Sequence, residues 1–155
     1  MDSSALITLA GADALPLLTL WPGKVLTIPE VYYETVEIGL MKGYPDAAAI
    51  ERCFSDRAVS TREPACRERL TGIGLVDSLV IRLAEELGAA NLLVNDHALL
   101  RRAEEHGIEA RFTAEFVCEL RDERRISSDR MVRLFQAFLE RRRYSEEFLN
   151  ALLMR

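Results

Sequence analysis

Apolar residues recur along this chain with two spacings, one typical of helices and the other of short buried strands. The helical spacing predicts helices over residues 4–10, 14–20, 30–41, 46–54, 75–87 and 96–106. Short runs rich in apolar and β-branched residues predict strands over residues 24–28, 57–61, 91–94 and 108–112. Strands that alternate with helices at these lengths are typical of βαβ units. The pattern therefore predicts an α/β fold with a mostly parallel sheet.

Proline, glycine and hydroxyl side chains mark the ends of several predicted helices. Pro29 stands at a first helical position, where its missing N–H costs no hydrogen bond. Gly88 suits the left-handed conformation that often closes a helix. The last 43 residues contain no strand pattern and predict three helices, capped by Thr113, by Ser127 or Ser128, and by Ser145. We expect an α/β core over residues 1–112 and a helical extension over 113–155, within one globular unit.

Composition places the chain among globular proteins. Its 155 residues fit one domain, and 49% hydrophobic residues suffice to form a core. The three cysteines match no zinc or redox spacing, which favours reduced thiols in a cytoplasmic protein. The apolar stretch 5–21 is interrupted and too short to cross a bilayer, so no membrane partner is expected.

Charge is unevenly distributed along the chain. The net charge of -5 argues against a protein that coats nucleic acid by bulk attraction. Residues 1–100 carry 14 acidic and 8 basic side chains, whereas residues 101–155 carry 11 acidic and 12 basic ones. Arginine groups at 101–102, 124–125 and 141–143 suit contacts with RNA phosphate. Because acidic residues accompany each group, a solvated ion-pair face is the alternative interpretation.

Four acidic residues that are far apart in sequence are the strongest sign of chemistry. Asp2, Glu34, Asp77 and Asp96 each lie where a strand ends or a helix begins. In a parallel sheet such positions converge on the edge where α/β folds bind ligands. Carboxylates gathered there would repel each other unless a cation joined them. Their hard oxygen atoms suit Mg²⁺ or Mn²⁺.

Each of these residues also has a purely structural interpretation. Asp2 and Asp96 suit the N-caps of the helices that follow them. Asp77 lies near the start of a helix, where the helix dipole favours an anion. Glu34 is harder to explain in this way, because its neighbours Val31 and Thr35 belong to an inward-facing stripe. Only the combination of all four points to a metal site.

The segments around these residues, DSSAL, VYYET, GIGLVDSLVIRLA and NLLVNDHALL, resemble in order and spacing the motifs of PIN-domain nucleases. The similarity extends over nearly the whole chain, and it is strongest to VapC-like toxins and to a subgroup with an extra C-terminal helical segment. It implies a three-layer αβα fold and a site for one or two Mg²⁺ or Mn²⁺ ions that hydrolyses RNA phosphodiesters. Asp2, Glu34, Asp77 and Asp96 would be both the catalytic residues and the metal ligands. Ser3 or Ser4 would orient a water or a phosphate, and Asn95 would assist the site.

The resemblance also implies partners, namely an RNA substrate, a small antitoxin protein and a second copy of the chain. The apolar residues Phe148, Leu149, Leu152 and Leu153 suit either a dimer interface or the core. The chain departs from the family pattern most clearly at its start, because only Met1 precedes Asp2 and the first central strand is missing; it also lacks a second acid beside Asp77, and Phe112-Thr113 replaces the expected Gly-Thr turn. Without that strand we expect the sheet to lose its middle and Asp2 its rigid mount. An interaction module that has lost its chemistry is therefore the alternative function.

A third interpretation, a metal-dependent phosphatase on another α/β fold, is disfavoured. Such enzymes usually carry a nucleophilic Asp followed two residues later by another Asp. That DxD pattern is absent around Asp2 and Asp96.

Overall fold

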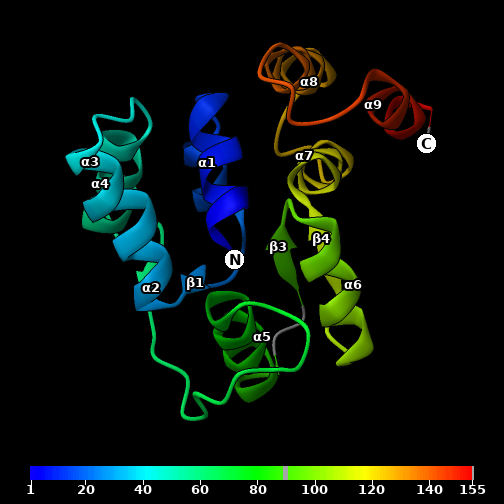
Figure 1. The fold of residues 1–155 in the computed structure, drawn as a ribbon. Helices are drawn as coiled ribbons and strands as arrows, with labels where there is room; N and C mark the ends of the chain where they lie inside the picture. Colours follow the sequence, from blue (N-terminus) through cyan, green and yellow to red (C-terminus); the bar gives the residue numbers. More distant parts are fainter. Residues whose placement is uncertain (89–90, 155) are drawn as a thin grey trace.

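The computed structural model describes residues 1–88 and 91–154, with helices packed around a few short parallel strands (Figure 1). Strand β1 (Leu26–Thr27) pairs in parallel with β2 (Ser60–Thr61), and β3 (Leu92–Val94) pairs in parallel with β4 (Ala110–Phe112). The predicted α/β fold with parallel pairing is confirmed, although β1 and β2 are shorter than the apolar runs suggested. None of the helices in the described residues combines the length and the apolar character that a bilayer span requires.

The N-terminal half is mainly helical. Its elements are α1 (Ser3–Gly11), a 3₁₀ helix (Leu15–Leu20), α2 (Pro29–Tyr32), a π-helical stretch η2 (Tyr33–Ile38), α3 (Gly39–Met41) and α4 (Ala47–Ser55). The segments α2, η2 and α3 follow one another without a break, so the helix predicted at 30–41 forms as one unit with a widened middle. Gly39 permits close packing against α4, since a Cβ atom there would lie 2.8 Å from the Ala47 Cβ.

Two helices of the second half confirm their predicted limits closely. Helix α5 (Leu75–Leu87) ends at Gly88, which has a φ of +54° and donates its N–H to carbonyls of the last turn. Helix α6 (His97–Glu105) follows β3 and is capped by Asp96. In Figure 1, α6 lies on the side of β3 and β4 away from α2, α3 and α4, so helices flank the strands on both sides.

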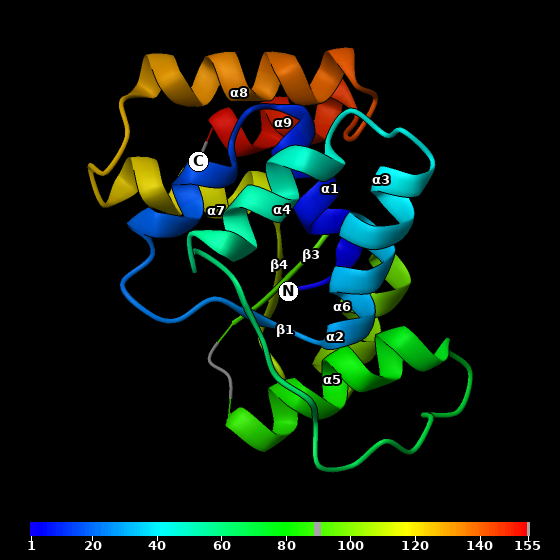
Figure 2. The same ribbon diagram turned by 90° about the vertical axis from the view of Figure 1, so that its left-hand side faces the viewer.

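The C-terminal segment consists of three helices, α7 (Thr113–Asp122), α8 (Ser128–Glu140) and α9 (Glu146–Leu153), at the end of the molecule opposite α5 (Figure 2). Ser127 and Ser145 cap α8 and α9 as predicted. Thr113 is the first helical residue of α7 rather than its cap, so that prediction is wrong. Leu149 and Leu152 are buried, which places them in the core rather than on an exposed interface.

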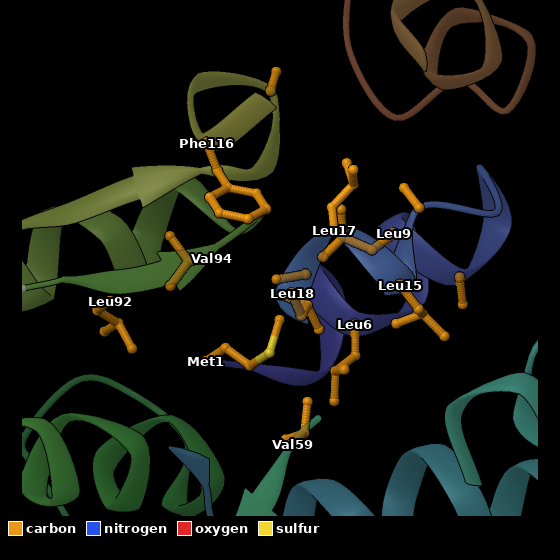
Figure 3. Close-up of a cluster of buried hydrophobic side chains, with 14 of the residues drawn as sticks. Met1, Leu6, Leu9, Leu15, Leu17, Leu18, Val59, Leu92, Val94 and Phe116 are labelled. Atoms are coloured by element: carbon orange, nitrogen blue, oxygen red, sulfur yellow. The ribbon is translucent and has the colours of Figure 1, made fainter. Parts of the chain in front are cut away.

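The two pairs of strands are bridged by the first two residues of the chain. The Met1 α-amino group donates to the Leu26 carbonyl of β1 at 2.8 Å. The Asp2 N–H donates to the Leu93 carbonyl of β3 at 3.2 Å. The Met1 side chain is buried between Leu92 and Val94 on one side and Leu6 and Leu18 on the other (Figure 3). Two cavities of about 90 Å³ each adjoin Met1, so the middle of the sheet is only partly filled.

Candidate metal centre

Asp2 is held rigidly at the point where the two ladders meet. Its backbone is bonded to β3, and the Thr27 hydroxyl donates to the Met1 carbonyl at 2.7 Å. Its carboxylate caps α1 by accepting from the Ala5 N–H at 2.9 Å, and it also accepts from the Ser4 hydroxyl. The side chain is only 5% exposed, and burial raises its pKa. The sheet does lose its middle, but the prediction that Asp2 would lose its mount is wrong.

Asp96 follows β3 directly and caps α6, accepting from the Leu99 N–H at 2.8 Å through Oδ1. Its side chain is exposed, and Oδ2 makes no hydrogen bond within the described residues. The structural role that the sequence suggested for both aspartates is therefore confirmed. It does not exclude metal binding, because a carboxylate has about four acceptor positions and capping uses one of them.

Asp77 lies in the first turn of α5, and its pKa is affected by burial and by the charges of the other three acidic residues. Burial is the largest cause that raises its pKa, and the negative charges of Asp2, Asp96 and Glu34 raise it further. A carboxyl group responds to like charges in this way only when they lie nearby. The structure thus brings the four acidic residues predicted from the sequence into one electrostatic neighbourhood.

Glu34 reaches this neighbourhood from the π-helical stretch η2. Its carboxylate is exposed and accepts from the Ser3 hydroxyl at 2.7 Å. Val31 and Thr35 on the same helix are buried, so Glu34 occupies the exposed flank of an inward-facing stripe. A π-turn shifts the direction of the side chains that follow it, and such turns are frequent at functional sites.

The four carboxylates do not form a preassembled metal cage. Over residues 1–88 and 91–154, no three side chains of His, Cys, Asp or Glu are placed to share one ion. The oxygen donors nevertheless fit Mg²⁺ or Mn²⁺, which bind few protein carboxylates and keep several waters. Burial raises the pKa of both Asp2 and Asp77, and for Asp77 the like charges of the other three acidic residues raise it further, so a negative charge on Asp77 lacks a compensating cation. A divalent cation bound among these carboxylates would supply that compensation.

A hydrogen-bonded network connects Asp2 to Asn95, the residue before Asp96. Asn95 donates its backbone N–H to the Ser4 hydroxyl at 3.1 Å, and Ser4 in turn donates to Asp2. The Asn95 side chain donates to Thr8 at 2.7 Å and accepts from the Thr113 hydroxyl at 2.8 Å and from the Tyr144 hydroxyl at 2.5 Å. Ser4 and Asn95 were expected at the site. Thr8, Thr113 and Tyr144 were not, because hydroxyl contacts between distant segments leave no periodic signal in the sequence.

The two histidines lie outside this cluster of carboxylates. The His97 ring packs edge-on against Phe112 with centroids 4.6 Å apart, and His106 Nδ1 lies 2.7 Å from Glu85 Oε1 on α5. Neither contact would hold the histidine in place as a ligand of a metal bound by the four carboxylates.

Comparison with known proteins agrees with the geometry. A family model described as a PIN domain matches residues 1–155. The chain has no significant match among curated proteins or solved structures. The match spans the region in which Asp2, Glu34, Asp77 and Asp96 converge, and the short parallel strands flanked by helices agree with it. Matched over its whole length, the chain belongs to the PIN-domain family, which is of the nuclease type.

Proposed function

We propose that this protein is a Mg²⁺- or Mn²⁺-dependent endoribonuclease. The observation that carries the proposal is the convergence of four carboxylates from four separate segments: burial is the largest cause of the raised pKa of Asp77, and the charges of Asp2, Asp96 and Glu34 raise it further. If each of the four residues had only a structural role in its own helix, nothing would require the four to lie close together. Collecting them costs electrostatic free energy, which a divalent cation would recover.

Asp2, Glu34, Asp77 and Asp96 would hold the ion. When bound, such an ion activates a water and stabilises negative charge during phosphodiester hydrolysis. Ser4 holds the Asp2 carboxylate and Ser3 holds the Glu34 carboxylate through the hydrogen bonds described above. Asn95, which directly precedes Asp96, is bonded through its backbone and side chain to α1, the helix that Asp2 caps, and through its side-chain oxygen to α7. These contacts restrict the carboxylates before any ligand enters.

Cleavage of a labelled structured RNA, in Mn²⁺ and in EDTA, tests the proposal. Asp96→Asn removes a charge but keeps a good N-cap, so α6 should remain folded. We expect the rate to fall about a hundredfold or more, since lost ligand charge costs several kcal/mol of transition-state stabilisation. Asp129→Asn, on the exposed first turn of α8, is the matched control and should cleave normally. Cleavage that persists in EDTA or in Asp96→Asn would refute the assignment.

An interaction module without chemistry is the second candidate. The absence of a preassembled cage among the described residues favours it. Titration calorimetry with Mn²⁺ separates the two functions. Saturable binding that Asp77→Asn abolishes supports the nuclease, whereas a folded protein that binds no Mn²⁺ and still captures RNA or protein supports the module.

We further propose a toxin role, held in check by a small antitoxin. The resemblance of the four motifs to toxin nucleases and the small size of the chain support this role. Induced expression in a bacterial host should arrest growth and deplete RNA, and Asp96→Asn should do neither. Normal growth during accumulation of the folded native protein would contradict the toxin role and leave the nuclease assignment to the cleavage assay.

A further inference from the structure

An open pocket of about 500 Å³ lies between His97, the residue after Asp96, and the C-terminal helices. Its walls come from the start of α6, the end of β4, the last turn of α8, the first turn of α9 and the segment between those two helices. They combine four rings with two arginines, namely His97, Phe112, Tyr144, Phe148, Arg142 and Arg143. The volume lies within the range of sites for small ligands.

The rings form a firm surface inside the pocket. Tyr144 and Phe148 stack with centroids 5.4 Å apart and an interplanar angle of 19°. Phe112 packs edge-on against Phe148 at 5.6 Å and against His97 at 4.6 Å. Phe112 is buried, whereas Tyr144 and Phe148 are partly exposed and His97 is exposed. An aromatic surface of this kind suits stacking of an unpaired base, which every nucleobase can provide.

The arginines of the pocket are free of carboxylate partners among the described residues. In the other two arginine groups, Arg102 pairs with Glu105 and Arg125 pairs with Glu123, as the ion-pair interpretation predicted. Arg142 and Arg143 are exposed and form no such pair with the part of the chain that the structure describes. An unpaired guanidinium presents a planar set of donors that matches phosphate.

Two residues of the pocket link it to the candidate metal centre. His97 directly follows Asp96, and the Tyr144 hydroxyl donates to Asn95, the residue before Asp96. A nucleotide held against these rings would therefore lie next to the carboxylates. Its phosphate would contact the guanidinium groups of Arg142 and Arg143, while the neighbouring phosphodiester would face the candidate metal centre.

We propose that this pocket binds one nucleotide of single-stranded RNA beside the bond to be cleaved, with the base against the Tyr144 and Phe148 rings and the phosphate on Arg142 and Arg143. The inference rests on the proposed function for the identity of RNA as substrate. Binding in EDTA tests it without requiring cleavage.

The test is fluorescence anisotropy with a short labelled single-stranded RNA in EDTA at several salt concentrations. For Arg142→Ala/Arg143→Ala we expect affinity to fall at least about tenfold and the salt dependence to weaken by about 0.7 per lost phosphate contact. Arg124→Ala/Arg130→Ala is the matched control. It removes the same charge from exposed positions near the opposite end of α8, and each pair contains one residue with positive φ, Arg142 at +53° and Arg124 at +59°. The control should bind as the native protein does.

The stacking part is tested by Phe148→Leu, which keeps an apolar side chain next to the core. We expect about a fivefold or greater loss of affinity, as for removal of one base-stacking partner. No binding by the native protein, equal losses in both double variants, or a preference for duplex RNA would overturn the pocket. Native RNA binding that the Arg142/Arg143 change weakens, together with no Mn²⁺-dependent cleavage, would uphold the pocket and refute the nuclease.

Discussion

The hydroxyl of Tyr144 donates a hydrogen bond of 2.5 Å to the side-chain oxygen of Asn95, and it thereby joins the segment before α9 to the residue before Asp96. The same hydroxyl accepts from the Ala114 N–H at 3.2 Å. Burial raises the pKa of Tyr144 to about 12, so the phenol remains a donor at neutral pH. The C-terminal helices thus contribute directly to the geometry of the candidate centre.

Tyr144→Phe should weaken the centre without unfolding the protein. The ring stacking with Phe148 remains, but Asn95 loses a donor, and a hydrogen bond of this kind contributes about 0.5–1.5 kcal/mol. We expect Mn²⁺ affinity to fall roughly threefold to tenfold, which is the free energy of one such hydrogen bond expressed as a change in affinity. Calorimetric Mn²⁺ titration measures this, and Tyr44→Phe, an exposed tyrosine elsewhere, should change nothing. Unaltered Mn²⁺ binding by Tyr144→Phe would show that the network is structural only.

The charged Asp77 side chain should destabilise the metal-free protein near neutral pH, first through its burial and then through the like charges of Asp2, Asp96 and Glu34. The pKa of Asp77 is raised in the folded state, so the folded protein binds its proton more tightly than the unfolded chain does. That contribution to stability is complete below the ordinary pKa of about 4 and is lost as pH rises through the folded pKa. Asp77→Asn should therefore melt higher than the native protein at pH 7 in EDTA, and the difference should shrink towards pH 4.

Addition of Mn²⁺ provides the complementary measurement for Asp77. Differential scanning calorimetry at pH 7 should show stabilisation of the native protein by Mn²⁺ and little effect on Asp77→Asn, because ligand binding to the folded state raises its melting temperature. Glu104→Gln on the exposed face of α6 serves as a charge-matched control. A native protein that melts higher than Asp77→Asn in EDTA at neutral pH would contradict the electrostatic account.

Helix limits were predictable where the signals are local. The apolar stripe and Gly88 define α5 within its own sequence, and Ser127 and Ser145 cap their helices through neighbouring N–H groups. Strand lengths were not predictable in this way. The run at 24–28 has strand character, but only Leu26 and Thr27 form a ladder, because a strand exists only as far as a partner backbone extends beside it.

The convergence of the four acidic residues was predictable, but the contacts that support them were not. Positions at strand ends and helix starts converge because of topology, which the alternating pattern indicates. The widened turn that carries Glu34 was not predicted, nor was the close approach of Gly39 to Ala47 just after it, since both involve contacts that a local apolar stripe does not specify. Thr113 has the sequence character of a helix cap, yet its hydroxyl donates to the side-chain oxygen of Asn95 and lies within hydrogen-bond distance of the Tyr144 hydroxyl. Both partners come from distant parts of the chain, so this contact could not be predicted from neighbouring residues.

Backbone strain at Arg124 offers a test that is independent of function. Arg124 follows α7 with a φ of +59°, a conformation that glycine adopts without strain. Arg124→Gly should stabilise the protein by about 0.5–1 kcal/mol. Arg101→Gly, on the exposed face of α6, should destabilise it by about 1 kcal/mol, since glycine weakens a helix interior. Chemical denaturation measures both, and a shift of the same sign in the two variants would contradict the assigned backbone conformations.

The α-amino group of Met1 predicts a pH dependence of the opposite sign. It is buried between β1 and β3, and burial lowers its pKa from 8.0 to about 6, against the opposing attraction of Asp2. The unfolded chain therefore binds the proton more tightly, and stability should rise as pH increases from 6 to 8, by up to about 2 kcal/mol. Nα-acetylation replaces the ammonium by an amide that still donates to the Leu26 carbonyl, and the adjoining cavities leave room for the acetyl group. The acetylated protein should be more stable than the native one at pH 6, with a smaller advantage at pH 8. Equal unfolding free energies of the two forms at pH 6, measured by urea denaturation, would show that the ammonium carries no desolvation cost in this position.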